Sequence, residues 1–271
     1  PKGIRPEGEG YENVFPCVYA VGRLVGNELR DCDGGVREVD RGFEFYAPQV
    51  FARHPSRPGP ALLMGWAGNA DEDDHPSVGS GGWVHTMTAP RELALRAGRL
   101  VQRPAVPLPD DAAELGLGRA PVTGRVRVSE LQGCRSWHLE LEAASFEAPG
   151  AAGDSGRWGL RIGEEPCCVD IDLVASASGT QLVVDRTTSR YAAHGARRRV
   201  TLPEGVRPRL EVLHDRSITE VLVGDGDIAF TLRSFLPPSA SGATVRTDGV
   251  LRLQRARAQI LERGRRPLVT R

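Results

Sequence analysis

Short runs in which apolar and polar residues alternate dominate the second half of the chain. The runs 137–143, 158–162, 169–173 and 228–232 each place apolar side chains at every second position. A period of two puts the apolar side chains on one face of an extended strand, so these runs predict half-buried β-strands. Helical periodicity is almost absent along the chain, which favours an all-β fold class.

Turn-forming residues separate the alternating runs. Asp215-Arg216-Ser217 divides two runs at 210–223, and Gly224-Asp225-Gly226 precedes the run 228–232. Several short strands separated by such turns are typical of a β-sandwich. We therefore expect residues 121–271 to form a β-sandwich domain.

The first part of the chain predicts a second β unit. The runs 17–21, 44–51 and 61–66 resemble strands with aromatic residues near their ends, and this arrangement suits the blades of a β-propeller. A proline-rich segment follows, with prolines at 104, 107, 109 and 121. We assign residues 1–105 to the propeller-like unit and 106–120 to an interdomain linker, with one short helix at 110–115.

The balanced charge of the chain argues against nucleic-acid and membrane partners and indicates no particular partner. Thirty-five basic and thirty-five acidic residues cancel, so we expect no binding to nucleic acid and no membrane association. The arginine-rich last twenty residues lack interleaved aromatic residues, so they predict a strand face followed by a solvated tail rather than a nucleic-acid surface. No stretch reaches the ~20 apolar residues of a membrane helix.

We also expect no metal and no other cofactor. Five cysteines are scattered without the paired spacing of a metal site, and we interpret them as reduced thiols in a cytoplasmic protein. The acidic run 71–75 offers oxygen ligands suited to Ca²⁺. It lacks the spaced pattern of a calcium loop, so a solvated loop is the favoured interpretation.

Three aromatic-rich blocks carry a family resemblance. They read D-R-G-F-E-F-Y-A-P-Q-V-F at 40–51, G-W-A-G-N at 65–69, and G-W-V-H-T-M-T-A-P-R-E-L at 82–93. In this order they resemble the later catalytic-domain motifs of glycoside hydrolase family 32, the invertase and sucrose-6-phosphate hydrolase group. The sequence D-R-S-I-T-E at 215–220 is similar to a hairpin motif in the same family.

The resemblance implies a five-bladed β-propeller followed by a β-sandwich, with residues 1–105 forming the last one to two blades. It implies a β-fructofuranosidase that hydrolyses sucrose or sucrose-6-phosphate by retaining double displacement, with two carboxyl groups ~5–5.5 Å apart. The family motifs W-M-N-D-P-N-G, R-D-P and E-C-P carry those carboxylates, and none of them occurs here. We therefore assign no catalytic residue, expect these residues upstream of Pro1, and expect this chain alone to be inactive.

The resemblance also assigns a sugar-binding wall. Tyr46 and Trp66 match family aromatics that face the fructosyl unit, where a ring packs on the sugar's C–H face. Glu44 stands where the family has Asp, and its longer side chain puts that specificity contact in doubt. Asp40 borders the leaving-group side of the pocket or simply forms a turn.

Other motif positions are interpreted structurally. We interpret Arg91 and Glu92 as a pair that holds the blade, and His85 as a hydrogen-bonded blade residue. The sole expected partner is a small sugar, in the cytoplasm of a bacterium. A non-catalytic carbohydrate-binding or interaction module remains an alternative, as does a fructan exohydrolase or fructosyltransferase of the same family. We also expect residues 1–105 to be poorly stable in isolation.

Overall fold

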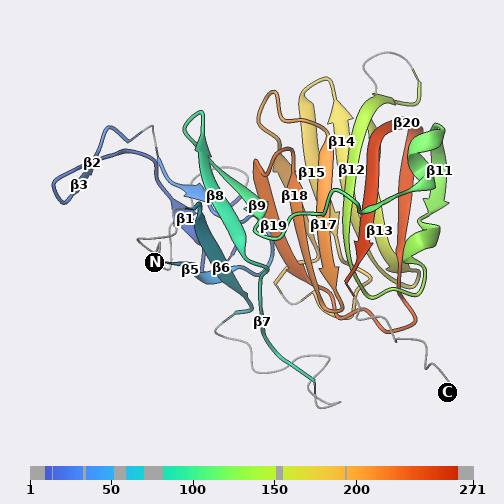
Figure 1. Ribbon diagram of the computed structural model, residues 1–271, viewed down its shortest axis with the longest axis horizontal. Helices are drawn as coiled ribbons and strands as arrows, with labels where there is room; N and C mark the ends of the chain where they lie inside the picture. The colour runs from blue at the N-terminus through green and yellow to red at the C-terminus, as the bar shows by residue number, and fades with distance from the viewer. Residues whose placement is uncertain are drawn as a thin grey trace.

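Two bodies of β-structure lie side by side in the computed structural model (Figure 1). The structure describes residues 10–13, 15–32, 35–51, 59–69, 82–150, 155–192 and 194–261. Within these ranges the helical elements are two short 3-10 turns, η2 (Gly116–Arg119) and η3 (Ser129–Leu131). The all-β prediction is therefore confirmed. In the same ranges no helix has the length and apolar character needed to cross a membrane.

The smaller body contains three antiparallel sheets. Its principal sheet, called the small sheet below, has the strand order β5-β6-β8-β9, with β7 paired to β6. Two further pairs, β1 with β4 and β2 with β3, lie beside it. The strands are β1 (Val18–Tyr19), β2 (Arg23–Val25), β3 (Glu28–Arg30), β4 (Arg37–Glu38), β5 (Tyr46–Phe51), β6 (Ala61–Ala67), β7 (Thr86–Met87), β8 (Arg91–Arg96) and β9 (Arg99–Pro104).

The larger body is one antiparallel sheet of eleven strands, called the large sheet below. Its main order is β16-β15-β14-β13-β20-β12-β17-β18-β19, and β10 and β11 pair with β20. The strands are β10 (Ala113–Glu114), β11 (Val122–Arg127), β12 (Ser136–Glu147), β13 (Gly156–Glu164), β14 (Cys167–Ser176), β15 (Gly179–Asp185), β16 (Arg197–Thr201), β17 (Arg209–Asp215), β18 (Ile218–Val223), β19 (Ile228–Arg233) and β20 (Ala243–Ile260).

The long strand β20 makes the large sheet curl. Its first part pairs with β11 and β13, and its second part pairs with β12 and β10. Register shifts at residues 142–145 of β12 mark where the pairing bends. Leu160 on β13 and Val212 on β17 belong to one apolar core, so both wings of the sheet enclose that core. The β-sandwich and the propeller blades stay predictions.

The alternation read from the sequence correctly identifies the inward faces. Trp137, Leu139 and Leu141 of β12 are completely buried. The polar residues between them are buried as well: His138 contacts the carboxylate of Glu211, and three arginines bind Glu140. On β14, Asp170 and Asp172 alternate with the apolar residues; Asp170 is half-buried and Asp172 is buried. Arg246 binds both carboxylates.

The helix predicted at 110–115 is wrong. Ala113–Glu114 forms strand β10, which pairs with β20, and the 3-10 turn η2 follows it. The backbone N–H of Leu115 donates to the carbonyl of Ala256 at 2.8 Å. Residues 113–115 thus find their partners along β20, and this tertiary pairing overrides a weak local helix preference.

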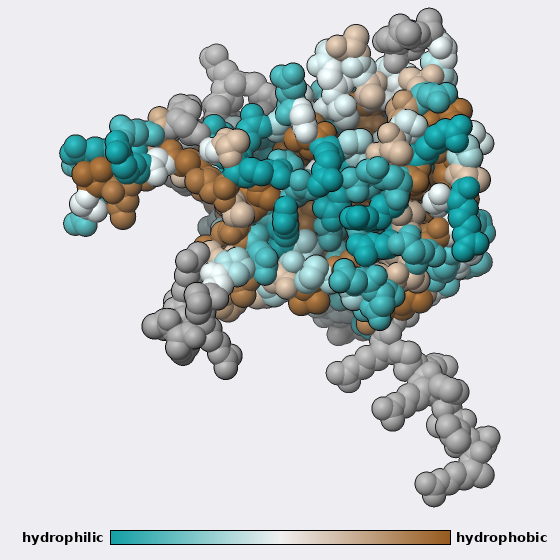
Figure 2. All heavy atoms as spheres, turned by 45° about the horizontal axis from the view of Figure 1, so that its top comes forward, coloured by the Kyte–Doolittle hydropathy of each residue, from teal (hydrophilic) through white to brown (hydrophobic). Residues whose placement is uncertain are grey.

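Exposed apolar side chains concentrate on the smaller body. Figure 2 shows apolar atoms on the protruding arm of β2 and β3 at the left, whereas hydrophilic atoms cover much of the large sheet in this view. On this arm Leu24 is 71% exposed and Leu29 is 48% exposed. On the small sheet Phe51 and Leu95 are also exposed. The smaller body therefore presents apolar surface that its own described residues do not cover.

A buried histidine lies within the large sheet. Nδ1 of His214, on β17, is 2.9 Å from the hydroxyl of Thr219 on β18, and its ring centroid is 5.1 Å from that of Trp137. Burial lowers the pKa of His214 to about 4, so the imidazole is neutral at pH 7.

This pKa predicts a loss of stability in acid. Between pH 6.5 and about 4 the unfolded chain binds a proton at His214 that the folded chain does not. The free energy of unfolding therefore falls as the pH decreases through this window, by up to about 1.4 kcal/mol per pH unit from this group. Urea denaturation of the wild type and His214→Gln at pH 7.5, 6 and 5 measures this contribution. A stability difference between the two proteins that is independent of pH would contradict it.

Candidate functional site

Four aromatic rings form a row on the smaller body. The centroids of Phe15 and Tyr46 are 5.1 Å apart, and those of Tyr46 and Trp66 are 5.9 Å apart. The imidazole of His85 meets the Trp66 ring edge-on at 4.7 Å. All four side chains are half-buried, so the row combines ring faces within reach of a ligand with polar tips on tyrosine, tryptophan and histidine.

Local backbone features orient these rings. Tyr46 pairs with Trp66 across β5 and β6, and the register shifts between Tyr46 and Gln49. Within this bulge Ala47 has φ 43°, a left-handed conformation that costs a non-glycine residue about 1–2 kcal/mol. A bulge redirects the neighbouring side chain, so the strain at Ala47 accompanies the placement of the Tyr46 ring.

Gly68 leaves the space that two of the rings occupy. A Cβ atom at this position would lie 2.2 Å from Nε1 of Trp66 and 2.5 Å from Nδ1 of His85. Any side chain there would displace one ring or the other. The glycine in the G-W-A-G motif is therefore a packing requirement of the ring row.

Asp40 joins the smaller body to edge strand β19 of the large sheet. Its Oδ1 accepts hydrogen bonds from the N–H groups of Gly42 and Thr231, both at 2.8 Å. Its Oδ2 accepts from the Thr231 hydroxyl at 2.7 Å and from Nη1 of Arg91 at 2.9 Å. A Cβ atom at Gly42 would lie 1.9 Å from the Thr231 carbonyl oxygen, so only glycine permits this approach of the two backbones.

Arg91 is the centre of this interface. Its guanidinium is buried, and all five of its N–H groups have a partner. Nε and Nη2 both donate to Oε2 of Glu220, at 3.0 and 2.6 Å. Nη1 donates to Asp40 and to Oε1 of Gln102, at 2.9 and 3.1 Å. Nη2 also donates to the hydroxyl of Thr231 at 2.7 Å.

The charges of this cluster support one another. Burial opposes the charge on Arg91, yet the carboxylates of Glu220 and Asp40 raise its pKa above the ordinary arginine value. Burial raises the pKa of Glu220, while Arg91 and the N–H of Ala89 act in the opposite direction. That N–H donates to Oε1 of Glu220 at 2.6 Å. The geometry favours an ionised Glu220 with both oxygens engaged.

Glu44 occupies a second buried position in the same interface. Its Oε1 lies 2.7 Å from Nη1 of Arg186 on the large-sheet body. Its Oε2 accepts the backbone N–H of Arg233 at 2.9 Å. The ring of Phe43 lies beneath Arg186, with the guanidinium carbon 4.0 Å from the ring centroid. Residues 40–44 therefore form one continuous contact with β19 and its surroundings.

The structure separates the four predicted sugar-binding residues into two groups. Tyr46 and Trp66 lie together in the ring row. Asp40 and Glu44 are buried between the two bodies, where protein groups bind their carboxylates. The assignment of all four to substrate binding stays a prediction.

Phe15 and the partners of Arg91 differ from what the sequence predicts. Phe15 extends the ring row, and no periodic pattern signals it. The predicted pairing of Arg91 with Glu92 is wrong, because Arg91 binds Asp40 and Glu220 instead. Successive residues of a strand point to opposite faces. The side chain of Glu92 accordingly lies elsewhere, in a groove on the other side of β8.

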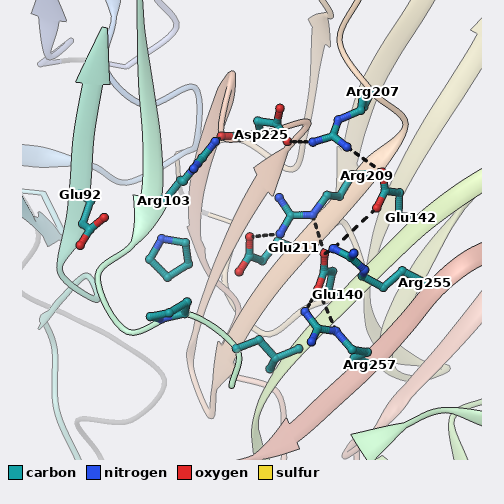
Figure 3. A pocket seen from close by; sticks show the side chains of 13 residues that line it. Glu92, Arg103, Glu140, Glu142, Arg207, Arg209, Glu211, Asp225, Arg255 and Arg257 are labelled. Atoms are coloured by element: carbon teal, nitrogen blue, oxygen red, sulfur yellow. Dashed lines mark hydrogen bonds and ion pairs between the residues drawn. The ribbon is translucent and has the colours of Figure 1, made fainter. Parts of the chain in front are cut away.

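That groove, of about 400 Å³, runs between the two bodies (Figure 3). Glu92, Arg103, Pro104, Pro107 and Leu108 line one wall, and the opposite wall comes from the large sheet. The large-sheet residues are Glu140, Glu142, Arg207, Arg209, Glu211, Asp225, Arg255 and Arg257. Dashed lines in Figure 3 join most of these arginines to carboxylates. In the described ranges, this groove included, no group of three or more His, Cys, Asp or Glu side chains is placed to hold a metal ion.

Comparison with known families identifies the class of protein. The model of the glycosyl hydrolases family 32 N-terminal domain matches residues 1–104, and the model of the family 32 C-terminal domain matches residues 118–259. Both the motifs and these matches place the chain among the glycosyl hydrolase families. The chain belongs to family 32 of that class.

Individual relatives agree with the family. A sucrose-6-phosphate hydrolase of Klebsiella pneumoniae is 29% identical over 244 residues, which are 87% of this chain and 44% of that protein. A sucrose-6-phosphate hydrolase of Staphylococcus xylosus is 28% identical over 252 residues, 92% of this chain and 48% of that protein. The chain therefore spans about half the length of these curated relatives.

Solved structures show the same fold. A Bombyx mori β-fructofuranosidase superposes with a TM-score of 0.67 at 22% identity, covering 96% of this chain and 50% of that one. A sucrose-6-phosphate hydrolase from Lactobacillus gasseri gives a TM-score of 0.66 at 22% identity, covering 92% and 48%. The spatial relation of the small and large sheets is thus shared with other members of the family.

A substitution at Gly68 tests the packing of the ring row. We expect Gly68→Ala to displace the Trp66 or His85 ring, because the new methyl group overlaps both. Near-ultraviolet circular dichroism and tryptophan emission should both change. Gly59→Ala is the matched control, since nothing lies within 4 Å of a Cβ atom at that position. Spectra of Gly68→Ala that coincide with those of the control would contradict the packing described here.

A substitution at Arg91 tests the interface. Arg91→Gln leaves the carboxylates of Asp40 and Glu220 buried without their cation, so we expect a loss of about 3–5 kcal/mol in the free energy of unfolding. Arg96→Gln, on the same strand, removes ion pairs of a half-exposed side chain and should cost about 1 kcal/mol or less. Urea denaturation measures both variants. Equal losses in the two would show that the buried cluster has no special role.

Proposed function

We propose that this chain is the C-terminal part of a β-fructofuranosidase that hydrolyses sucrose or sucrose-6-phosphate with retention of configuration. The observation that carries the proposal is the ring row, in which Tyr46 and Trp66 lie together at the family motif positions. Family membership and relatives with the name sucrose-6-phosphate hydrolase support the same substrate class.

In this proposal the rings bind the sugar, and the reacting carboxylates come from sequence outside this chain. A ring face packs against the C–H face of a fructosyl unit, and the Tyr46 hydroxyl and Trp66 N–H offer hydrogen bonds. Double displacement needs a nucleophile and an acid/base about 5–5.5 Å apart. Asp40 and Glu44 do not suit these roles, because both are buried and their oxygens are bound by protein groups.

The proposal includes an architecture for the whole enzyme. The small sheet would be one blade of a five-bladed propeller, and the large sheet would be the β-sandwich that follows it. The exposed apolar side chains of the smaller body would then contact the other blades. Their exposure in this chain supports the proposed architecture. We further propose a bacterial cytoplasmic enzyme whose partner is a small sugar, without nucleic acid, membrane or cofactor.

The experiment measures reducing-sugar release from sucrose and from sucrose-6-phosphate. It compares this 271-residue chain with a protein extended upstream in its reading frame through the nucleophile and E-C-P motifs. We expect activity in the extended protein only. In that protein Trp66→Ala should lower kcat/KM about tenfold, through loss of ring packing. Ile260→Ala, at an exposed position on β20 of the large sheet, is the control and should have no effect.

The outcomes separate the alternatives. Activity on fructan but not on sucrose would favour an exohydrolase, and transfer to a second sugar would favour a fructosyltransferase. An upstream sequence without the three motifs, in a protein that binds sugar but does not cleave it, would favour a non-catalytic module. Activity of the 271-residue chain alone would show that the reacting carboxylates do not lie outside it. Asp40 and Glu44 would then be the first candidates to mutate.

A further inference from the structure

The groove between the two bodies has its charges arranged in layers. The carboxylates of Glu140 and Glu142 lie deep in the wall, with side chains 1% and 5% exposed. The guanidinium groups of Arg207 and Arg255 lie above them, with side chains 56% and 49% exposed. The lining contains as many acidic as basic residues, yet the surface of this wall that meets solvent is mainly guanidinium.

The buried carboxylate of Glu140 accepts hydrogen bonds from arginines with both of its oxygens. Oε1 of Glu140 accepts from Arg209 and Arg255, and Oε2 accepts from Arg257. Burial opposes the charge of Glu140, but these three arginines lower its pKa. The carboxylate therefore stays ionised and fixes the three guanidinium groups in place. A preorganised set of donors is what an anion site requires.

Several guanidinium N–H groups at the solvent side of the groove are available to donate hydrogen bonds to a ligand. Among the described residues, Arg103 forms one hydrogen bond, from Nε to the carbonyl of Asp225 at 3.3 Å. Arg255 uses only Nη1, toward Glu140 and Glu142. Within the described part of the chain, Nη1 and Nη2 of Arg103 and Nη2 of Arg255 thus have no protein acceptor. Arg103 belongs to β9 and Arg255 to β20, so the two walls offer donors from opposite sides (Figure 3).

We propose that this groove binds a phosphate monoester of a small organic molecule. The phosphate oxygens would accept hydrogen bonds from Arg103 and Arg255, whose planar forks match such an oxyanion. The organic part would lie on the apolar surface of Pro104, Pro107 and Leu108, and Glu92 would accept a hydrogen bond from one of its hydroxyl groups. A groove of about 400 Å³ is larger than inorganic phosphate needs and suits a small ligand.

The proposal is independent of the proposed enzymatic function. Different residues form the ring row of Tyr46 and Trp66. Because the ligand would touch both bodies, its binding would also stabilise the folded chain by mass action.

Isothermal titration calorimetry and thermal unfolding of the 271-residue chain test the site. The probes are glycerol 3-phosphate, inorganic phosphate and glycerol, with potassium chloride matched for ionic strength. We expect the strongest binding and the largest rise in Tm with glycerol 3-phosphate, a weaker effect with inorganic phosphate, and none with glycerol. Arg103→Gln and Arg255→Gln should each weaken binding about tenfold or more, since each removes charge-assisted hydrogen bonds.

Two controls keep the result interpretable. Arg252→Gln removes an exposed arginine from the same strand β20 outside the groove, and it should bind as the wild type does. Among the residues that the structure describes, Arg103 makes one hydrogen bond, to a backbone carbonyl, so Arg103→Gln should remain folded even if Arg255→Gln does not. Equal effects of chloride and phosphate, or unchanged affinity in Arg103→Gln, would overturn the proposal.

Discussion

The relative position of the two bodies of this protein depends on one buried cation, the guanidinium of Arg91. Arg91 reaches from the small sheet between Asp40 and Glu220, and its five N–H groups all find acceptors. Removing a guanidinium and two carboxylates from water costs several kcal/mol per ion. The cluster offsets that cost only because every donor is satisfied, and this in turn fixes the two sheets in one relative position.

The same cluster lies behind the ring row. Glu220 holds the backbone N–H of Ala89, and the adjacent Thr88 exchanges hydrogen bonds with Gly65, the residue before Trp66. The large sheet thereby supports the strand that carries the proposed sugar-binding tryptophan. The large sheet thus contributes to the proposed binding surface, since rigid sites need support from the residues behind them.

Glycines set how closely the bodies approach. A Cβ atom at Gly226 would lie 1.8 Å from the carbonyl oxygen of Gln102, and one at Gly42 would overlap the backbone of Thr231. Backbone hydrogen bonds cross the interface at both places. The interface is thus built from backbone contact and buried ion pairs, whereas the main apolar core of the described residues comes from the larger body, apart from Phe43.

The sequence by itself determined the all-β class, the inward faces of strands such as β12, the hairpin turns at 215–217 and 224–226, and the family. These features are local, because alternation and turn chemistry act over a few residues. Tertiary structure decided that residues 113–114 pair with β20 rather than form a helix, that Arg91 binds Asp40 and Glu220 rather than Glu92, and that Phe15 joins the ring row. Each depends on partners distant in the chain, whose approach no local pattern of side chains encodes.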